Sequence, residues 1–212
     1  MTGVVLFGAG SPFCADVAES CRRADLPVVA AVRNVPGPVH VPGDIRVVEA
    51  AALTPDLLAL PFLLPLFGPA NRRKALAAAT ELGFRRMAQL IDPTAIAARD
   101  LEVGDGVYVN AGCILATGIR LDRFSLCNRG ANLGHGCRLG AFASIGPGAV
   151  LCGDVDVGES AQIGAGAIIL PKVTIGGGAL VAGGAVVAGD VPADGFAAGN
   201  PARILARRPE PR

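Results

Sequence analysis

The feature that most constrains the fold is a six-residue period in the second half of the chain. From Val103 to Val187, every sixth residue is Val, Leu or Ile, except for Cys127. The residue four places later in each hexad is small or β-branched, and no insertion breaks the phase. An α-helix repeats every 3.6 residues and a flat strand every two residues, so neither structure explains a period of six.

A coil of three short strands joined by tight corners does explain this period. The aliphatic residue points inward from each flat face, and the small residue fits near each corner. Stacked coils pair their backbones along the axis, so each coil stabilises its neighbours. Cys113, Cys127 and Cys137 fall at inward positions and are interpreted as small buried hydrophobic residues. The repeat therefore predicts an all-β parallel β-helix over residues 91–205.

The first ninety residues have the pattern of an α/β domain. The apolar run GVVLFGAG ends in a glycine turn, and a segment with helical spacing follows, with Ser11 as N-cap and Pro12 in the first turn. Two more buried strands are predicted at 27–32 and 61–68, and a helix over 70–82 that ends at Gly83. This order predicts a small parallel sheet of Rossmann-like type with crossover helices over residues 1–90.

Composition limits the possible classes of function. A net charge of +1 in 212 residues provides no electrostatic basis for binding nucleic acid or an anionic membrane. The most apolar segment, residues 57–68, is too short to span a bilayer and contains two prolines. The stretch MTGVVLFGAG does not have the pattern of a secretory signal, so none is expected, and the six cysteines form no C-x-x-C pair. We expect a cytoplasmic protein with reduced thiols and no metal site.

One of the two histidines, His135, stands inside the repeat in the stretch NLGHGCRLG, residues 132–140. Leu133 and Leu139 occupy inward positions, so the repeat leaves position 135 free to point outward. Imidazole is the side chain best suited to proton transfer near neutral pH. Function therefore explains His135 better than packing does, although a hydrogen-bonded corner histidine is the alternative. His40 lies in a proline-rich loop and is interpreted as a surface residue.

The order of motifs resembles that of a known family. An α/β domain with a glycine turn is followed by IDPTAIAARDLEVGDGVYVNAGCIL, by hexads with NLGHGCRLG, and by GNPARIL. This order is similar to that of the hexapeptide-repeat sugar O- and N-acyltransferases, within them the sialic-acid O-acetyltransferase and nucleotide-aminosugar N-acetyltransferase group. The resemblance implies a left-handed β-helix, a homotrimer with active sites between subunits, and acetyl-CoA as the acyl donor.

The resemblance also implies roles for residues at the catalytic centre. His135, in the context H-x-C-x-[IL]-G, matches the general base, and the Gly153 N–H is a candidate donor to the oxyanion of acyl transfer. The family usually has an acidic residue after the histidine, but this chain has Gly136. Asp154 lies one 18-residue coil later, about 5 Å away by the spacing of strands, and is proposed as the substitute.

Other positions match the family's ligand contacts, with three further departures. Ser144 replaces a histidine that contacts acetyl-CoA, and Arg33 and Asn34 replace acidic residues after the second strand. The glycine loop GAGSPFCAD is also shorter than usual. Implied cofactor contacts are Ser144, Ala165, Gly183, Pro201 and Arg203. Implied contacts to the nucleotide-sugar substrate are Gly8, Ala9, Gly10, Ser11, Arg33, Asn34, Gly68 and Asn128, the last of which has an inward amide ladder as its alternative.

The leading hypothesis is an acyltransferase that moves an acetyl group from acetyl-CoA to an amine or hydroxyl of a sugar or nucleotide-sugar. The departures leave an alternative, a catalytically impaired trimeric scaffold or small-molecule binding protein. A carbonic anhydrase built on the same repeat is excluded, because it requires three zinc-binding histidines and the chain has two. Residues 206–212, rich in proline and charge, are expected to form a flexible tail.

Overall fold

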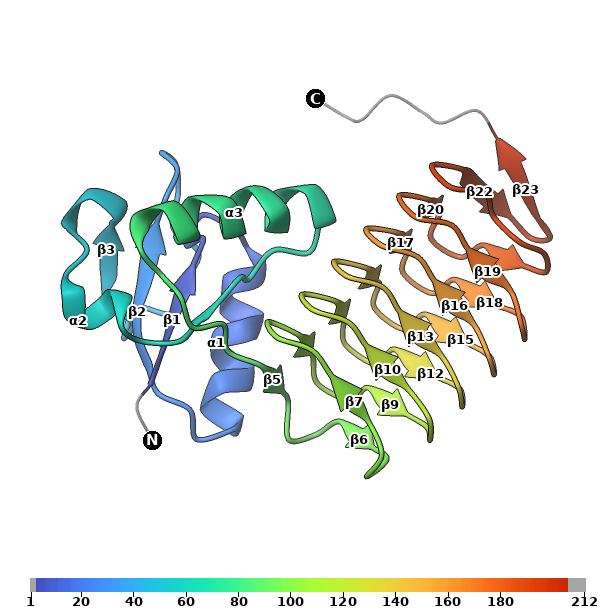
Figure 1. Ribbon diagram of the computed structural model, residues 1–212, viewed down its shortest axis with the longest axis horizontal. Helices are drawn as coiled ribbons and strands as arrows, with labels where there is room; N and C mark the ends of the chain where they lie inside the picture. The colour runs from blue at the N-terminus through green and yellow to red at the C-terminus, as the bar shows by residue number, and fades with distance from the viewer. Residues whose placement is uncertain (1–2, 206–212) are drawn as a thin grey trace. The chain divides into compact units, whose positions relative to one another are not determined.

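The computed structural model describes residues 3–205, so the tail expected at 206–212 lies outside the described residues. The chain divides into two compact units, Met1–Pro93 and Thr94–Arg212. The first unit combines helices with a parallel sheet, and the second is a stack of β-strand coils (Figure 1).

The first unit contains a four-stranded parallel sheet in the order β3-β2-β1-β4. Its elements are β1 (Val4–Phe7), α1 (Phe13–Arg23), β2 (Val28–Arg33), β3 (Val47–Glu49), a 3₁₀ turn (Ala50–Ala52), α2 (Pro55–Leu58), β4 (Phe62–Leu63), α3 (Pro69–Leu82) and β5 (Leu90–Ile91). The predicted parallel sheet with crossover helices is thus present. The edge strand β3 escaped prediction because it is three residues long and two of its side chains are exposed.

Both predicted helices form, with small differences at their ends. α1 begins at Phe13, whose N–H donates to the Ser11 Oγ at 3.3 Å, and Pro12 before it already has helical dihedrals of −55° and −27°. α3 ends at Gly83, whose φ of 110° lies in the left-handed region that favours glycine. Phe7, Phe62 and Phe84 pack together in the core of this unit.

The second unit is a parallel β-helix with three faces, and almost all of its strands are two residues long. The isoleucine face consists of β6 (Ile96–Ala97), β9 (Ile114–Leu115), β12 (Asn132–Leu133), β15 (Val150–Leu151), β18 (Ile168–Ile169) and β21 (Val186–Val187). The charged face consists of β7 (Glu102–Val103), β10 (Arg120–Leu121), β13 (Arg138–Leu139), β16 (Asp156–Val157) and β19 (Thr174–Ile175). The third face contains β8 (Tyr108–Val109), β11 (Leu126–Cys127), β14 (Ser144–Ile145), β17 (Gln162–Ile163), β20 (Leu180–Val181), β22 (Phe196–Gly199) and the antiparallel β23 (Ala202–Leu205).

The register confirms that one coil takes eighteen residues. Asn132 pairs with Val150, and Leu133 pairs with Leu151. The second residue of each pair of strand residues points inward, so the predicted aliphatic positions from Val109 onward are all buried, as are the small positions. The three cysteines assigned to the interior are also buried. The hexad pattern is therefore the core of this unit.

From Gly106 to Gly184, each corner places one residue in the left-handed region of backbone conformation. This residue follows the inward aliphatic residue by three positions, as Gly136 (φ 70°) and Asp154 (φ 59°) illustrate. Glycine accommodates this φ without steric cost, which explains part of its abundance. Phe124 and Phe142 occupy the same position on successive coils, and their rings stack with centroids 5.1 Å apart.

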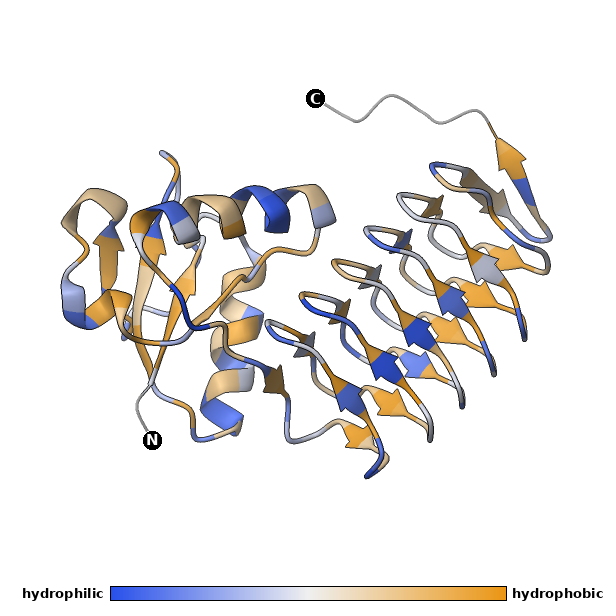
Figure 2. Ribbon diagram, viewed as in Figure 1, coloured by the Kyte–Doolittle hydropathy of each residue, from blue (hydrophilic) through white to orange (hydrophobic). Residues whose placement is uncertain are grey.

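The outward residues give two of the faces opposite characters. Figure 2 shows mostly orange strands on the isoleucine face, where Ile96, Ile114 and Ile168 are exposed, beside mostly blue strands on the charged face. On the charged face, the Arg120 Nε donates to Glu102 at 2.7 Å. None of the helices within residues 3–205 combines the length and the apolar character that a bilayer span requires.

Candidate functional site

His135 lies at the corner between β12 of the isoleucine face and β13 of the charged face. Its side chain is 68% exposed, so the repeat does present it outward as predicted. The backbone carbonyl of His135 accepts a hydrogen bond from the Asp154 N–H at 2.8 Å. The stacking of coils thus fixes which two residues of the next coil stand beside the histidine, namely Gly153 and Asp154.

The imidazole of His135 lies against the backbone of Gly153. A Cβ on Gly153 would stand 2.5 Å from the His135 Nε2 and 2.6 Å from Cε1, well inside van der Waals contact. Glycine is therefore the residue that lets the ring occupy this place. Among the backbone hydrogen bonds of residues 3–205, none has the Gly153 N–H as donor. A backbone donor thus lies next to the imidazole.

The carboxylate of Asp154 occupies the space over Gly136. A Cβ on Gly136 would stand 2.3 Å from the Asp154 Oδ1, and that oxygen is 3.7 Å from the His135 Nδ1. This distance is too long for a hydrogen bond but allows an ion pair when the imidazole is protonated. An acid therefore lies beside the histidine although Gly136 follows it in the chain. Asp154 therefore lies where it can replace the acidic residue that the family has after the histidine. Its catalytic role stays a prediction.

Two of the expected cofactor contacts lie on another corner. Ala165 and Gly183 are exposed, one coil apart, between the third face and the isoleucine face. A Cβ on Gly183 would stand 3.2 Å from the Ala165 carbonyl oxygen, so the two residues are in contact. Six residues of extended chain span about 20 Å. Within one chain, His135 and the Ala165–Gly183 pair therefore lie at opposite edges of the isoleucine face.

The expected cofactor contacts near the end of the chain lie on a hairpin. β22 and β23 pair antiparallel, and Arg203 lies opposite Ala198 with its side chain exposed. Pro201 is in the turn between the strands, and the Asn200–Pro201 peptide bond is cis. These two residues therefore belong to a separate place at the C-terminal end of the coil.

Two expected ligand contacts are not on the surface, which corrects the view of them taken from the sequence. Ser144 is 0% exposed on β14, so its hydroxyl has no surface to offer a cofactor in this chain. Asn128 is also buried, and its Oδ1 accepts a hydrogen bond from the Asn110 Nδ2 at 3.0 Å. Asn128 thus belongs to an inward amide ladder, the alternative noted for it.

In the first unit, several expected substrate residues line one crevice of about 460 Å³. It opens where β1 and β4 end. The chain runs from β1 to β2 and β3 on one side of β1 and then crosses to β4 on the other side, so the strand order reverses between β1 and β4. Open parallel sheets bind ligands at such a switch point, outside the carboxyl ends of the strands. The lining residues are Gly8, Gly10, Ser11, Asn34, Val35, Leu66, Asn71, Lys74, Ala75 and Ala78.

Besides Asn128, three expected substrate residues do not line this crevice. Ala9 is fully buried, and its N–H donates to the Val32 carbonyl at 2.9 Å. Gly68 is the N-cap of α3, and its carbonyl accepts from the Arg72 N–H. Arg33 lines a second cavity and forms an ion pair with Glu49.

The structure adds residues that the sequence did not single out. Asn71 and Lys74 extend from α3 into the crevice and supply an amide and a cation. Arg72 is 2% exposed and donates to the carbonyls of Leu66 at 2.8 Å and Phe67 at 2.6 Å. Burial, with a smaller effect of the nearby Arg73, lowers the pKa of Arg72 to about 9. Arg72 thus holds the loop that carries Leu66 into the crevice wall.

Among residues 3–205, no group of three His, Cys, Asp or Glu side chains could hold a metal ion. The chemistry available is that of an exposed imidazole, a carboxylate beside it and a backbone N–H. Such a set can remove a proton and stabilise a developing oxyanion.

Comparison with solved structures shows several similar chains. PerB from Caulobacter crescentus, solved with CoA and GDP-perosamine, is 33% identical with a TM-score of 0.85, over 96% of this chain and 97% of PerB. The acetyltransferase domain of PglB from Neisseria gonorrhoeae, solved with acetyl coenzyme A, is 28% identical with a TM-score of 0.84, over 96% of this chain and 99% of that domain. WeeI from Acinetobacter baumannii has the same fold at 23% identity, with a TM-score of 0.76 over 96% of this chain and 99% of WeeI.

Two further structures are variants of the perosamine N-acetyltransferase of Caulobacter crescentus in which one histidine is replaced by asparagine or by alanine. Each is 31% identical to this chain over 97% of both chains, with a TM-score of 0.83. No protein-family model matches the chain, and no curated protein matches it.

Proposed function

Because the chain belongs to the hexapeptide-repeat sugar acyltransferase family, we propose that it transfers an acetyl group from acetyl-CoA to the amine of a nucleotide-linked sugar. The observation that carries the proposal is the exposed imidazole of His135 beside Gly153 and Asp154. The amine, rather than a hydroxyl, is favoured because the relative with CoA and GDP-perosamine is named an N-acetyltransferase. The left-handed sense of the coil and the Rossmann-like class of the sheet belong to the same proposal.

His135 acts as the general base through Nε2. Nδ1 faces the Asp154 carboxylate, so Nε2 is the nitrogen left for the acceptor. As the amine nitrogen attacks the thioester carbon, Nε2 takes a proton from it, and the imidazolium that results lies next to the negative charge of Asp154. Asp154 thereby supplies the carboxylate that the sequence lacks at position 136.

The negative charge that develops on the thioester oxygen needs a fixed donor. The Gly153 N–H is available beside the imidazole and serves this purpose in the proposal. When the tetrahedral intermediate collapses, the C–S bond breaks, the new amide bond remains, and the sulfur of CoA receives the proton held by His135. The products are the acetylated amine and free CoA.

A homotrimer brings together the two edges that one chain keeps apart. If the isoleucine face of each chain turns toward a threefold axis, the His135 edge of one chain approaches the Ala165–Gly183 edge of the next. The exposed isoleucines on that face then become buried, which favours the assembly through the hydrophobic effect. The acyl donor would lie between two chains, against the exposed backbone at Gly183.

The acceptor's nucleotide is assigned to the crevice of the first unit. Gly10 and Ser11 line this crevice next to the start of α1, and the positive end of a helix dipole attracts phosphate groups. Lys74 adds a cation to the same crevice. The cytoplasmic location expected from reduced thiols stays a prediction.

The test measures release of CoA from acetyl-CoA with a panel of nucleotide-linked amino sugars as acceptors. We expect turnover with at least one of them, and a loss of about 10²- to 10⁴-fold in His135→Ala, the usual contribution of a general base. His40→Ala is the matched control, because it removes the other histidine of the chain. An undiminished rate in His135→Ala would overturn the assignment of the base.

A further inference from the structure

A second cavity of about 350 Å³ adjoins the crevice of the first unit. The two cavities share Asn34 and Val35 as lining residues. The second cavity has apolar walls, which include Pro36 and Ala50, and Val35 is 54% exposed at the shared wall. A space with an apolar wall, next to the loop proposed to bind phosphate, is suited to a flat ring.

Two charged residues with fixed geometry stand in this cavity. Arg33 ends β2, Glu49 ends β3, and the two are partners in the strand register. The Arg33 Nε donates to the Glu49 Oε1 at 2.8 Å, and the terminal guanidinium nitrogen that pairs with Glu49 also contacts Oε1. Within residues 3–205, the structure shows no hydrogen bond to the Glu49 Oε2. The other terminal nitrogen of Arg33, Nη1, donates to the Gly37 carbonyl at 3.5 Å. The side chains are 37% and 53% exposed, so the guanidinium N–H groups that none of these bonds uses and the second carboxylate oxygen can reach a ligand.

Building on the proposed function, we infer that this cavity binds the base of the acceptor's nucleotide and that Arg33 and Glu49 select guanine. The pair offers donors from Arg33 directly beside an acceptor from Glu49. Guanine has the matching order along one edge, with the acceptors N7 and O6 followed by the donors N1–H and N2–H₂. Arg33 would donate to the acceptors, and the Glu49 Oε2 would accept from the donors.

The other bases do not match this order. Uracil and thymine have a single donor, N3–H, between two carbonyl oxygens, so one oxygen would face the carboxylate. Adenine has an amino group where guanine has O6, so a donor would face the Arg33 guanidinium. Each mismatch places two donors or two acceptors together. This lowers the affinity for the wrong base more than the absence of one contact would.

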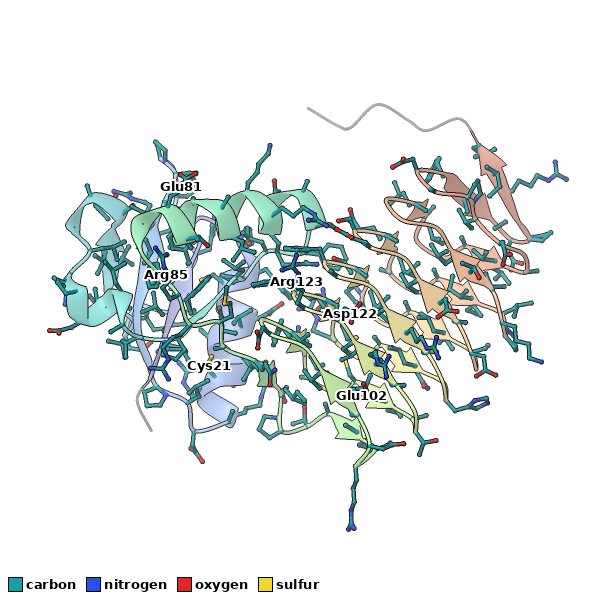
Figure 3. All side chains as sticks on the ribbon, viewed as in Figure 1. Cys21, Glu81, Arg85, Glu102, Asp122 and Arg123 are labelled. Atoms are coloured by element: carbon teal, nitrogen blue, oxygen red, sulfur yellow. The ribbon has the colours of Figure 1, made fainter. Side chains whose placement is uncertain are left out.

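The stability of the fold alone does not explain why the Arg33–Glu49 ion pair is present. Exposed ion pairs contribute little to the free energy of folding. The chain contains a comparable pair, Arg120 with Glu102, on the charged face of the β-helix, where Figure 3 labels Glu102. The two pairs differ in their surroundings, because only the Arg33–Glu49 pair adjoins the crevice at the switch point of the sheet.

The test is isothermal titration calorimetry of the full-length protein with GDP, IDP, UDP, dTDP and ADP. IDP is the sharpest probe, because its base is guanine without the 2-amino group. We expect GDP to bind about 5- to 150-fold more tightly than UDP, the range for one bidentate contact to a base. Glu49→Gln should remove most of this preference, whereas the matched variant Glu102→Gln should keep it. Both variants should retain the melting temperature of the wild type.

The outcomes separate this inference from the proposed function. Equal affinity for all five nucleotides, tighter binding of UDP or dTDP, or no nucleotide binding at millimolar concentration would each overturn the selection of guanine. Acetyl transfer to a uridine- or thymidine-linked amino sugar would then still support the proposed function. Selective binding of GDP without acetyl transfer to any guanosine-linked amino sugar would support the base site and overturn the proposed reaction.

Discussion

The imidazole of His135 and the backbone of Gly153 occupy adjoining places on successive coils, with room between them for a hydrogen atom but not for a methyl group. This relationship follows from the 18-residue register, because 135 and 153 differ by one coil. The ring that lies against it thus explains why position 153 is a glycine. Its backbone is not in the left-handed region, so its need for glycine comes from the close approach.

Gly153→Ala should therefore displace the imidazole without harming the fold. We expect kcat to fall about 100-fold, the cost of misplacing a reacting group by about 1 Å. Steady-state kinetics and a thermal melt measure the two effects. Gly189→Ala is the matched control, because a Cβ there meets no atom within 4 Å and should leave kcat unchanged. Wild-type kcat in Gly153→Ala would show that the observed position of the ring does not matter.

Asp154 should supply the carboxylate beside His135 that position 136 lacks. His135 and Asp154 are both exposed, so their pairing contributes at most about 1 kcal/mol, and Asp154→Asn should lower kcat about 5-fold. Gly136→Asp in the wild type should push the Asp154 carboxylate aside, because a Cβ there would be 2.3 Å from Oδ1.

The double exchange Gly136→Asp with Asp154→Gly removes that close contact and returns the carboxylate to the position that follows the histidine. Asp tolerates the left-handed backbone of this corner better than most residues. We expect kcat of the double variant to exceed that of Asp154→Asn. A double variant slower than Asp154→Asn would argue against an electrostatic role for Asp154.

Assembly should depend on the isoleucine face. Ile168→Glu places a charge on the face proposed to turn toward the threefold axis, so we expect the trimer to dissociate and turnover to be lost. Thr174→Glu, on the charged face, is the control and should leave the trimer intact. Light scattering after size-exclusion chromatography measures the mass in solution. A trimer that survives Ile168→Glu would exclude this face from the interface.

The thiols should differ sharply in reactivity. Burial raises the pKa of Cys14 to about 12 and that of Cys21, labelled in Figure 3, to about 12. At pH 8, about one molecule in 10⁴ then carries either thiolate, and the thiolate is the nucleophile. Cys152 is half-buried, so a disulfide reagent should modify it first in the native protein, and all six thiols only after unfolding. Rapid native labelling of Cys14 or Cys21, detected by mass spectrometry, would contradict this prediction.

Part of the fold could be predicted because it depends on spacing along the chain. The hexads specified the inward residues, the 18-residue coil and hence the approach of Gly153 and Asp154 to His135. The burial of Ser144 and the amide ladder of Asn128 could not be predicted, because the same hexad position is exposed on one face and buried on another.

By itself, the sequence determined the β-helix, its core and the outward position of His135, since a strict period acts locally and repeats. Only the tertiary structure decided the crevice and its neighbouring cavity. Their walls come from the ends of β1, β2, β3 and β4 and from α3, segments that are far apart in the chain. The order of strands in the sheet brings Lys74 near Gly8 and Glu49 against Arg33, and no period in the sequence encodes that order.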